Sequence, residues 1–451
     1  MAQDSNTASK RIGRYARVST AMGGLAAKMA GEKFLGIKID RDEHARVLKD
    51  ALGNLRGPLM KVAQLLATIP DALPKEYVRE LQELQAQAPP MGWPFVKRRM
   101  QAELGAKWDS HFNDFPRSAA AAASLGQVHK AVTTDGKIVA CKLQYPGMDS
   151  AVEADLKQLK LIFSMYEAYD KAIQTKYVVD EIGERLREEL DYTREAKNCS
   201  LYGYILKDEK NVYVPQVVPE LSTQRLLTTH WLQGKPILEY KNASQETRNA
   251  IALNLFRAWY VPLYQCGIIH GDPHLGNYTI RDDLSLNLLD FGCVRVFPPR
   301  FIQGIMDLYR GLQKNDRAQI VHAFEAWGFE NLDNGVIDAL IVWARFLYQA
   351  LLDDRVRVIG KSEGTIYGRD TAMQVHQALR EHGRKHGGVI VPREFVFMDR
   401  AALGLGSVFI HLQAEINWHR LFEELTAGFD PKTLAKQQKT LLKKFDLSEL
   451  G

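Results

Sequence analysis

The hydrophobic and polar positions along the chain follow two periods, which divide it into helical and strand-forming stretches. Alternation with a period of two, broken by turn residues, indicates strands, whereas apolar positions three and four apart indicate amphipathic helices. In chain order, the pattern predicts helices over 51–110, strands with a hairpin turn at Asp135-Gly136 over 112–143, helices over 150–205, strands over 212–240, a helix over 244–266 capped by Ser244, a strand–loop–strand stretch over 268–292 and helices from 298 onward. We therefore expect an α+β protein whose carboxyl-terminal part is largely helical.

The sequence before this region predicts a weakly amphipathic helix over 9–31, interrupted at Gly23-Gly24 and flanked by basic residues. Such a basic edge can rest on anionic lipid, although an ordinary surface helix explains the same pattern. Asp4 is the only acidic residue before Glu32, which is also typical of a mitochondrial transit peptide. These three interpretations stay open.

Composition and charge narrow the classes of partner. The chain has 451 residues, of which 46% are hydrophobic and 25% charged, as in ordinary soluble globular proteins of two or three domains. Residues 1–50 carry ten Lys/Arg against six Asp/Glu, and residues 431–451 carry five against two, so that the middle of the chain is slightly acidic. This distribution argues against a broad nucleic-acid surface and suggests basic ends near an anionic partner or membrane.

Cysteine spacing bears on the redox state of the compartment, and hydropathy bears on whether the chain crosses a membrane. The four cysteines lie far apart without a Cys-x-x-Cys pair, which is typical of a reducing compartment without disulfides or structural zinc. The longest apolar run, around 336–352, contains Asp338 and Arg345 and is too short and polar to cross a bilayer. We expect it to be a core helix, and we expect the chain not to span a membrane by itself.

Three polar side chains mark the strand–loop–strand stretch as a candidate site. Asp272 is followed by Asn277 five residues later and by Asp290 thirteen residues after that. Protein kinases use the same residue types in the same order, with the first Asp near the acceptor hydroxyl and the Asn and second Asp on Mg²⁺. Mg²⁺ prefers oxygen ligands and shares them with nucleotide phosphates, so two or three protein oxygens suffice. The spacing predicts a site for Mg²⁺ and ATP.

Two other interpretations fit the same stretch. One is a surface turn followed by a buried strand, with Asp290 at a solvated end. The other is a metal hydrolase in which His270, Asp272 and His274 are alternate ligands. Zinc sites need three or four ligands, and no other cluster of His, Cys and Asp accompanies these.

A second candidate site lies on the predicted hairpin. The strand after the Asp-Gly turn carries Lys142 in the pattern Val-Ala-Cys-Lys, where kinases place the lysine that contacts the α- and β-phosphates. In the preceding turn, residues 119–123 are alanines where kinases have glycines, which let backbone amides approach phosphate. Only Gly126 remains. We expect a helical or stiffer loop here, which would hold nucleotide differently from an ordinary kinase.

The helical regions offer acidic and polar partners for that lysine. One acid of 150–205 should pair with Lys142, as a helix glutamate does in kinases. Spacing does not decide between Glu189, Asp191 and Glu195, and a plain charged helix explains each of them. In the helix predicted around 57–66, Lys61 and Gln64 share one face. From composition alone, we would interpret that face as a solvent-exposed edge of the helix.

Six motifs follow one another in a fixed order. They are Lys61-Val-Ala-Gln64, the alanine-rich loop ending Ser124-Leu-Gly-Gln-Val-His129, Val-Ala-Cys-Lys142, Glu189-Leu-Asp191, His270-Gly-Asp-Pro-His-Leu-Gly-Asn277 and Asp290-Phe-Gly. Together they resemble the UbiB/AarF-type atypical kinases, which include the aarF-domain-containing kinases of coenzyme Q biosynthesis. The resemblance runs from about Arg11 to Leu312. One departure is Ala63, which stands where the family has glycine and adds a methyl group at a helix contact.

The resemblance implies a protein-kinase-like two-lobed fold with an N-terminal helical extension and a largely helical C-terminal lobe. In the family, the residues matching Lys61 and Gln64 project into the active site, and the helical extension blocks access for protein substrates. The acids matching Glu189 and Asp191 face that lysine, and the glutamate matching Glu195 pairs with the strand lysine. The expected segments are a basic helical segment 1–50, the extension 51–110, the N-lobe 111–230 and the C-lobe 231–451.

These expectations assign the site residue by residue. We assign Asp272, Lys142 and Glu195 to catalysis, and Asn277 and Asp290 to the metal. The residues assigned to nucleotide binding are Ala121, Ala122, Ala123, Ser124, Gly126, Gln127, Lys142, Lys61, Gln64, Glu189 and Asp191, with Thr229 and Trp231 on the connection between the lobes. The cofactors implied are ATP and Mg²⁺.

The resemblance also implies a biological setting. The expected function is an atypical kinase or ATPase that supports ubiquinone biosynthesis or related lipid handling at a membrane. The expected partners are isoprenoid-quinone precursor lipids or proteins of a biosynthetic complex, with peripheral contact to an anionic membrane and no nucleic acid. A homodimer is left open. The expected location is cytoplasmic, peripheral on the inner face of a membrane, or the mitochondrial matrix in a eukaryote.

Two other functions remain as alternatives. The first is a nucleotide-binding scaffold or lipid-binding chaperone of a biosynthetic complex with little turnover, which the alanine loop and the blocking helix favour. The second is a small-molecule phosphotransferase of the aminoglycoside-kinase type, which shares the His-Gly-Asp and Asp-Phe-Gly motifs. It leaves the motif from Lys61 to Gln64 unexplained.

Overall fold

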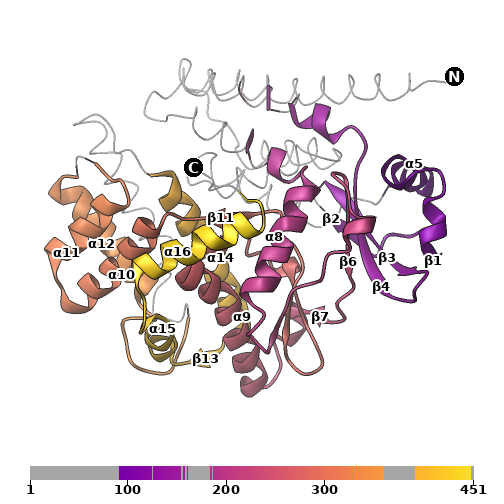
Figure 1. Ribbon diagram of the computed structural model, residues 1–451. Helices are drawn as coiled ribbons and strands as arrows, with labels where there is room; N and C mark the ends of the chain where they lie inside the picture. Colours follow the sequence, from indigo (N-terminus) through magenta and orange to yellow (C-terminus); the bar gives the residue numbers. More distant parts are fainter. Residues whose placement is uncertain are drawn as a thin grey trace, which may run out of the picture. The chain divides into compact units, whose positions relative to one another are not determined.

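The computed structural model describes residues 91–123, 125–153, 156–157, 160, 183–184, 186–330, 332–359 and 392–447 (Figure 1). The helix predicted over 9–31, most of the 51–110 extension with Lys61 and Gln64, and Ser124 of the alanine loop lie outside them. The described residues form two compact units. The first contains the described residues from 91 up to Thr193 together with Val218–Thr229, and the second contains Arg194–Val217 and the described residues from His230 onward.

The described part of the first unit contains a five-stranded sheet, and helix α5 packs on one of its faces. The sheet order is β1-β3-β4-β6, and β2 pairs with β3. The expected hairpin is present, since β3 and β4 are antiparallel on either side of Gly136, whose φ of +82° suits a glycine in the turn. The elements are α5 (Trp93–Leu104), a 3₁₀ turn (Trp108–His111), β1 (Phe112–Asp114), β2 (Ala121–Ala123), β3 (Gly126–Thr133), β4 (Ile138–Gln144) and β6 (Leu226–His230).

Alternation along β4 separates the core of this unit from its polar face. Val139, Cys141 and Leu143 are buried in one cluster with Val96 and Met100 of α5. The residues between them, which include Lys142, point to the other side of the sheet because successive strand residues alternate. The hydrophobic pattern therefore fixes which face of the sheet carries the lysine.

The second unit is built around the long helix α9 (Gln245–Cys266). Ser244 caps it as predicted, accepting a hydrogen bond from the Thr247 amide, and Gly267 ends it at a φ of +66°. Two small sheets accompany it, with orders β5-β10-β9-β7 and β11-β8. The elements are α8 (Tyr192–Ile205), which begins at the end of the first unit, β5 (Val212–Tyr213), β7 (Lys235–Pro236), β8 (Ile268–His270), β9 (Tyr278–Ile280), β10 (Leu286–Leu288) and β11 (Val294–Val296).

The remainder of the second unit is largely helical, as predicted, and α9 lies buried in its core. The helix expected around 336–352 is α12, whose buried residues join that core. Among the described helices, none combines the length and the hydropathy needed to cross a bilayer. The helices are α10 (Pro299–Lys314), α11 (Arg317–Ala326), α12 (Asn334–Tyr348), α14 (Arg393–Leu412), α15 (Trp418–Thr426) and α16 (Pro431–Lys444), with a short β12–β13 pair (Arg357–Val358 and Glu415–Ile416) among them.

The last helix closes the end of α9 through one buried side chain. Gln438 of α16 donates hydrogen bonds from Nε2 to the carbonyl oxygens of Cys266 and Phe297, each at 2.9 Å. A Cβ on Gly267 would lie 2.5 Å from that same nitrogen, so a glycine is required there for space as well as for its φ. Gln438 thus joins the residue that ends α9 to the residue that follows β11.

A buried polar cluster joins α5 to β3. Gln127 accepts a hydrogen bond from the Met91 amide at Oε1 (2.7 Å), and its Nε2 donates to Met91 O (3.3 Å) and to His129 Nε2 (2.9 Å). His129 Nδ1 in turn donates to Pro116 O at 2.9 Å. This arrangement needs a neutral imidazole, because Nε2 must accept. Burial lowers the pKa of His129 below its ordinary 6.5, against the hydrogen bond to Pro116, which raises it.

The cluster predicts a pH-dependent stability. The unfolded chain protonates His129 near pH 6.5 and the folded chain only at lower pH, so the contribution is complete above about pH 6.5 and falls as the pH drops. Urea unfolding between pH 8 and pH 5 should show this loss. His129→Phe should be less stable at every pH but should lose less on acidification. Equal pH slopes for the two proteins would contradict the prediction.

Candidate functional site

The two aspartates of the central motif are brought together by a short strand pair. β8 and β11 are antiparallel, with His270 opposite Val294. The Gly271 amide donates a 2.6 Å hydrogen bond to the Cys293 carbonyl and extends the pairing by one step. Asp272 follows the end of β8 and Asp290 precedes the start of β11, so both lie at the same end of this pair.

Asn277 links the two segments that carry these aspartates. Its Nδ2 donates to the Asp272 carbonyl at 3.0 Å, and its carbonyl accepts from the Leu289 amide at 3.1 Å. The amide nitrogen is thereby directed to Asp272, which leaves Oδ1 as the side-chain atom able to bind a cation. The structure therefore brings Asp272, Asn277 and Asp290 into one constellation in the second unit.

His270 supports this loop from inside the core. It is 2% exposed, its Nδ1 accepts from the Asp272 amide at 3.4 Å, and its Nε2 donates to the Asp290 carbonyl at 2.5 Å. His274 accepts from the Gly276 amide through Nδ1. Among the described residues, no three His, Cys, Asp or Glu side chains are grouped as a metal site. These contacts give both histidines a role in holding the loop, which argues against the metal-hydrolase interpretation.

Two carboxylates converge beside the Asp-Phe-Gly segment. Asp290 Oδ1 accepts from the Gly292 amide at 3.0 Å, and Glu195 is almost fully buried. A Cβ on Gly292 would lie 3.3 Å from Asp290 Oδ1 and 3.8 Å from Glu195 Oε2. Asn198, one turn along α8, donates to the Phe291 carbonyl at 3.0 Å and anchors the helix there. The donor set is entirely oxygen, which fits Mg²⁺.

The other candidate residues lie on the polar face of the first unit. Lys142 is half-buried and stands opposite Val128 on β3, which in turn stands opposite Ala121 on β2. The Lys142 ammonium lies 5.2 Å from the centroid of the Tyr192 ring. Gly126 pairs with Ala123 at the turn between β2 and β3. The alanine loop, Gly126 and Lys142 therefore lie on neighbouring strands, as expected from the predicted hairpin.

Gln127 is placed differently from the other loop residues. Its side chain lies on the α5 face of the sheet, opposite to Lys142, and is 2% exposed in the cluster with His129 and Met91. Its assignment to nucleotide binding is therefore unsupported for the side chain, which holds α5 on the sheet. No local pattern reveals this contact, because the partner, Met91, lies 36 residues away in the sequence.

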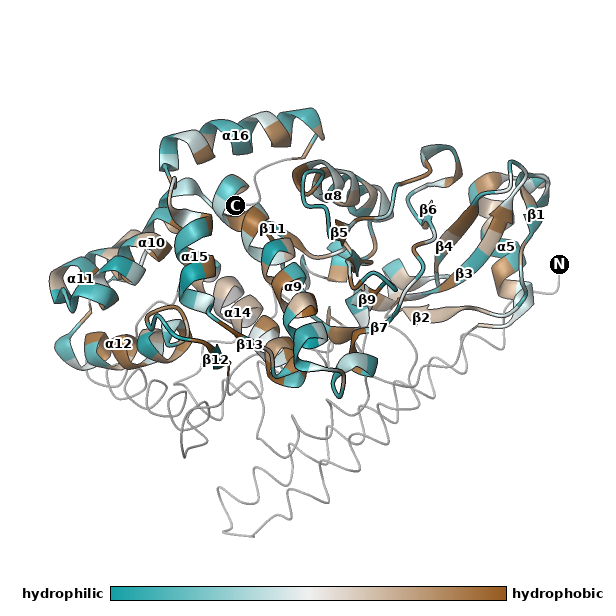
Figure 2. Cartoon of the chain, turned by 90° about the horizontal axis from the view of Figure 1, so that it is seen from below, coloured by the Kyte–Doolittle hydropathy of each residue, from teal (hydrophilic) through white to brown (hydrophobic). Residues whose placement is uncertain are grey.

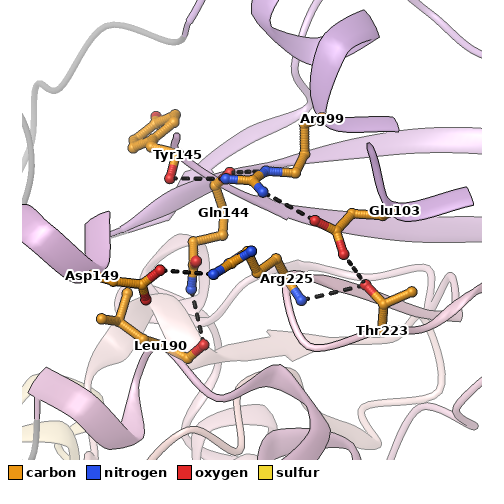
Figure 3. A network of polar contacts seen from close by, with 8 residues as sticks. All are labelled: Arg99, Glu103, Gln144, Tyr145, Asp149, Leu190, Thr223 and Arg225. Carbon is orange, nitrogen blue, oxygen red and sulfur yellow. Dashed lines mark hydrogen bonds and ion pairs between the residues drawn. The ribbon is translucent and has the colours of Figure 1, made fainter. Parts of the chain in front are cut away.

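The acidic turn of the first unit is tied to the strand that carries Lys142. Gln144 lies on the same face as Lys142 and donates from Nε2 to the carbonyl of Leu190 at 3.0 Å (Figure 3). Leu190 stands between Glu189 and Asp191, so this bond fixes the turn that presents both acids. Arg99 of α5 donates to the Gln144 carbonyl (3.0 Å) and extends the network (Figure 3).

The last two predicted nucleotide residues fall in different units. Thr229 is half-buried on β6, beside β4 in the first sheet, and Trp231 is half-buried in the second unit. Three residues that sequence reasoning missed are Tyr192, Gln144 and Asn198. The sequence could have indicated them only through their positions next to the motifs. Tyr192 directly follows Glu-x-Asp, Gln144 lies two residues after Lys142, and Asn198 lies one helical turn after Glu195.

A comparison with models of protein families identifies the family of this chain. A model of the ABC1 atypical kinase-like domain matches residues 83–324, more than half of the chain. The chain belongs to this family. The α+β, kinase-like fold class predicted from the sequence is thereby confirmed, and a kinase-like domain implies that ATP is used.

Relatives of this ABC1-family chain come from distant organisms. The mitochondrial atypical kinase COQ8 of Saccharomyces cerevisiae is 32% identical over 263 residues, covering 58% of this chain and 52% of its own length. The mitochondrial coq-8 of Caenorhabditis elegans is 29% identical, covering 72% and 46%. The chain spans about half the length of these curated relatives. A solved structure titled as the complex of Rv3197 with erythromycin, from Mycobacterium tuberculosis, matches with a TM-score of 0.59 at 27% identity, covering 85% of this chain and 96% of that one.

Gly126 offers a test of the loop geometry. A Cβ added there would overlap the carbonyl oxygen of Leu143 and lie 2.9 Å from the Tyr192 hydroxyl. Gly126→Ala should therefore lower the free energy of unfolding by about 1–3 kcal/mol, the usual cost of forcing a methyl group into a packed site. Gly92→Ala is the matched control, because its Cβ would meet nothing closer than 3.7 Å. Urea unfolding of both variants checks this, and equal stabilities would contradict it.

Proposed function

We propose that this chain is a Mg²⁺-dependent ATPase or atypical kinase. The observation that carries the proposal is the convergence of Asp272, Asn277 and Asp290, which are joined by backbone contacts at one end of the β8–β11 pair. Protein kinases use the same three residue types in the same order, which supports the proposal. Membership of the ABC1 family supports the same reaction class.

Each residue then has a role in positioning charge. Asn277 and Asp290 would hold Mg²⁺, which would neutralise charge on the nucleotide phosphates. Lys142 orients the α- and β-phosphates, and its pairing with Glu195 remains part of the proposal. Asp272 positions the attacking hydroxyl or water and accepts its proton. Most of the rate enhancement would come from placing the reactants and stabilising charge.

The substrate class we propose is lipid. The family resemblance points to ubiquinone biosynthesis or related handling of isoprenoid lipids at a membrane. A scaffold with little turnover is the second candidate, and the replacement of loop glycines by Ala121, Ala122 and Ala123 favours it, because side chains there restrict the approach of backbone amides to phosphate. Turnover on a peptide panel, compared with turnover in the presence of lipid vesicles, separates these functions.

Replacing Asp290 with Asn tests the enzyme directly. The change removes a charge from the metal site with little change in shape, so phosphate release from Mg·ATP should fall at least about 10²–10³-fold. Asp282→Asn, the same change on an exposed turn nearby, should leave turnover unchanged. Near-native turnover in Asp290→Asn would exclude the assignment. Tight Mg·ATP binding without turnover by the wild type would instead favour the scaffold.

We also propose that α16 faces an anionic membrane. The helix has five lysines and no acidic residue, and Lys432, Lys436, Lys439 and Lys443 are exposed at helical spacing. The opposite side is buried in the second unit, and the outer side is strongly hydrophilic (Figure 2). At its end, the Lys444 ammonium lies 3.5 Å from the centroid of the half-exposed Tyr204 ring. Such a row of lysines suits the phosphate groups of an anionic bilayer.

Sedimentation with vesicles tests this surface. Each lysine near an anionic bilayer contributes about 1 kcal/mol, so replacing Lys432, Lys436 and Lys439 with Gln should weaken binding to vesicles rich in phosphatidylserine by at least about tenfold. The control removes three other exposed lysines, Lys97, Lys107 and Lys241. Equal binding by the two triple variants would exclude α16 as the contact surface.

A further inference from the structure

The lysine of the first unit rests above a buried aromatic ring. The Lys142 ammonium lies 5.2 Å from the centroid of Tyr192, and Tyr192 is 1% exposed. A cation within about 6 Å of a ring centroid is attracted by the negative face of the ring, and the attraction grows when water is excluded. The ring therefore contributes to where the ammonium lies, in addition to the other contacts of Lys142.

Tyr192 is held by its neighbours on several sides. Its amide donates to the Gln224 carbonyl at 3.2 Å, just before β6. Its hydroxyl lies so close to Gly126 that an added Cβ there would be 2.9 Å away. Two residues earlier, the carbonyl of Leu190 accepts from Gln144 on β4 (Figure 3). The backbone of Tyr192 is therefore tied to β4 and to the segment that leads into β6, and its hydroxyl packs against β3 at Gly126.

We propose that Tyr192 is a positioning residue for Lys142, whose ring holds the ammonium where it meets the phosphates of a bound nucleotide. The hydroxyl packed at Gly126 couples that position to the alanine loop. The inference rests on the proposed function, because it takes Lys142 as the phosphate contact. It adds to that function a second element of phosphate recognition, an aromatic support that follows directly after Glu189 and Asp191.

A purely structural role for Tyr192 makes a different prediction. A ring that only fills the core would, when altered, disturb the binding of any ligand of this unit, with or without phosphates. A ring that positions Lys142 should affect ATP and leave adenosine unchanged. Its effect should also disappear once the lysine is removed, because the two residues then act through one contact.

The test compares two rings of nearly equal shape at position 192 of the full chain. Tyr192→Phe keeps the negative face of the ring, and a trifluorinated phenylalanine at the same position removes it. Dissociation constants for Mg·ATP and for adenosine, measured by calorimetry, are the readout. The same fluorinated residue at Phe112, buried on the other face of the sheet, is the control.

We expect the fluorinated ring to bind ATP on the order of tenfold more weakly than Tyr192→Phe, a size typical of a desolvated cation–ring contact. Adenosine binding should be the same for both, and in a Lys142→Met background the two rings should bind ATP equally. The proposal is overturned if the two rings bind ATP alike, if adenosine weakens in parallel, or if the difference survives in Lys142→Met. Failure of the wild type to bind Mg·ATP would overturn the proposed function as well, so the two failures are distinguishable.

Discussion

The close approach of Gly271 to Cys293 sets the separation of the two segments that carry Asp272 and Asp290. The 2.6 Å hydrogen bond between them continues the β8–β11 pair and leaves no room for a side chain, since a Cβ on Gly271 would lie 2.6 Å from the Cys293 sulfur. Because the two chains are this close, Asp272 and Asp290 emerge side by side. The loop between them is then held by hydrogen bonds from the side chains of Asn277 and His270 to the carbonyl oxygens of Asp272 and Asp290.

In the first unit, Lys142 lies on one face of a sheet whose opposite face is buried in the hydrophobic core. Alternation on β4 produces this arrangement, with Cys141 and Leu143 in the core and Lys142 between them. The polar residues that accompany Lys142 are themselves anchored, Gln144 to the acidic turn and Tyr192 to the glycine of the alanine loop. Small residues in that loop therefore serve packing as well as any contact with nucleotide.

Local sequence signals predicted the elements well but not the partners of buried polar groups. The turn at Asp135-Gly136, the cap at Ser244 and the face of Lys142 each depend on neighbours within a few residues, which periodicity and turn chemistry report. Gln127 alternates correctly on its strand, yet its burial depends on Met91, and no local pattern reveals such a pairing. Asn198 likewise looks like an ordinary helix residue until the Phe291 carbonyl is placed against it.

The hydrogen bonds of Gln438 have a consequence for how the chain is made. They join Gln438 to residues 172 and 141 positions earlier, one at the end of α9 shortly before β8 and one directly after β11. A ribosome releases α9 and both strands long before it reaches α16. Contacts of such sequence separation form late and slow the folding of a domain. During synthesis, the segment between β8 and β11 therefore stays incompletely packed until α16 has been made.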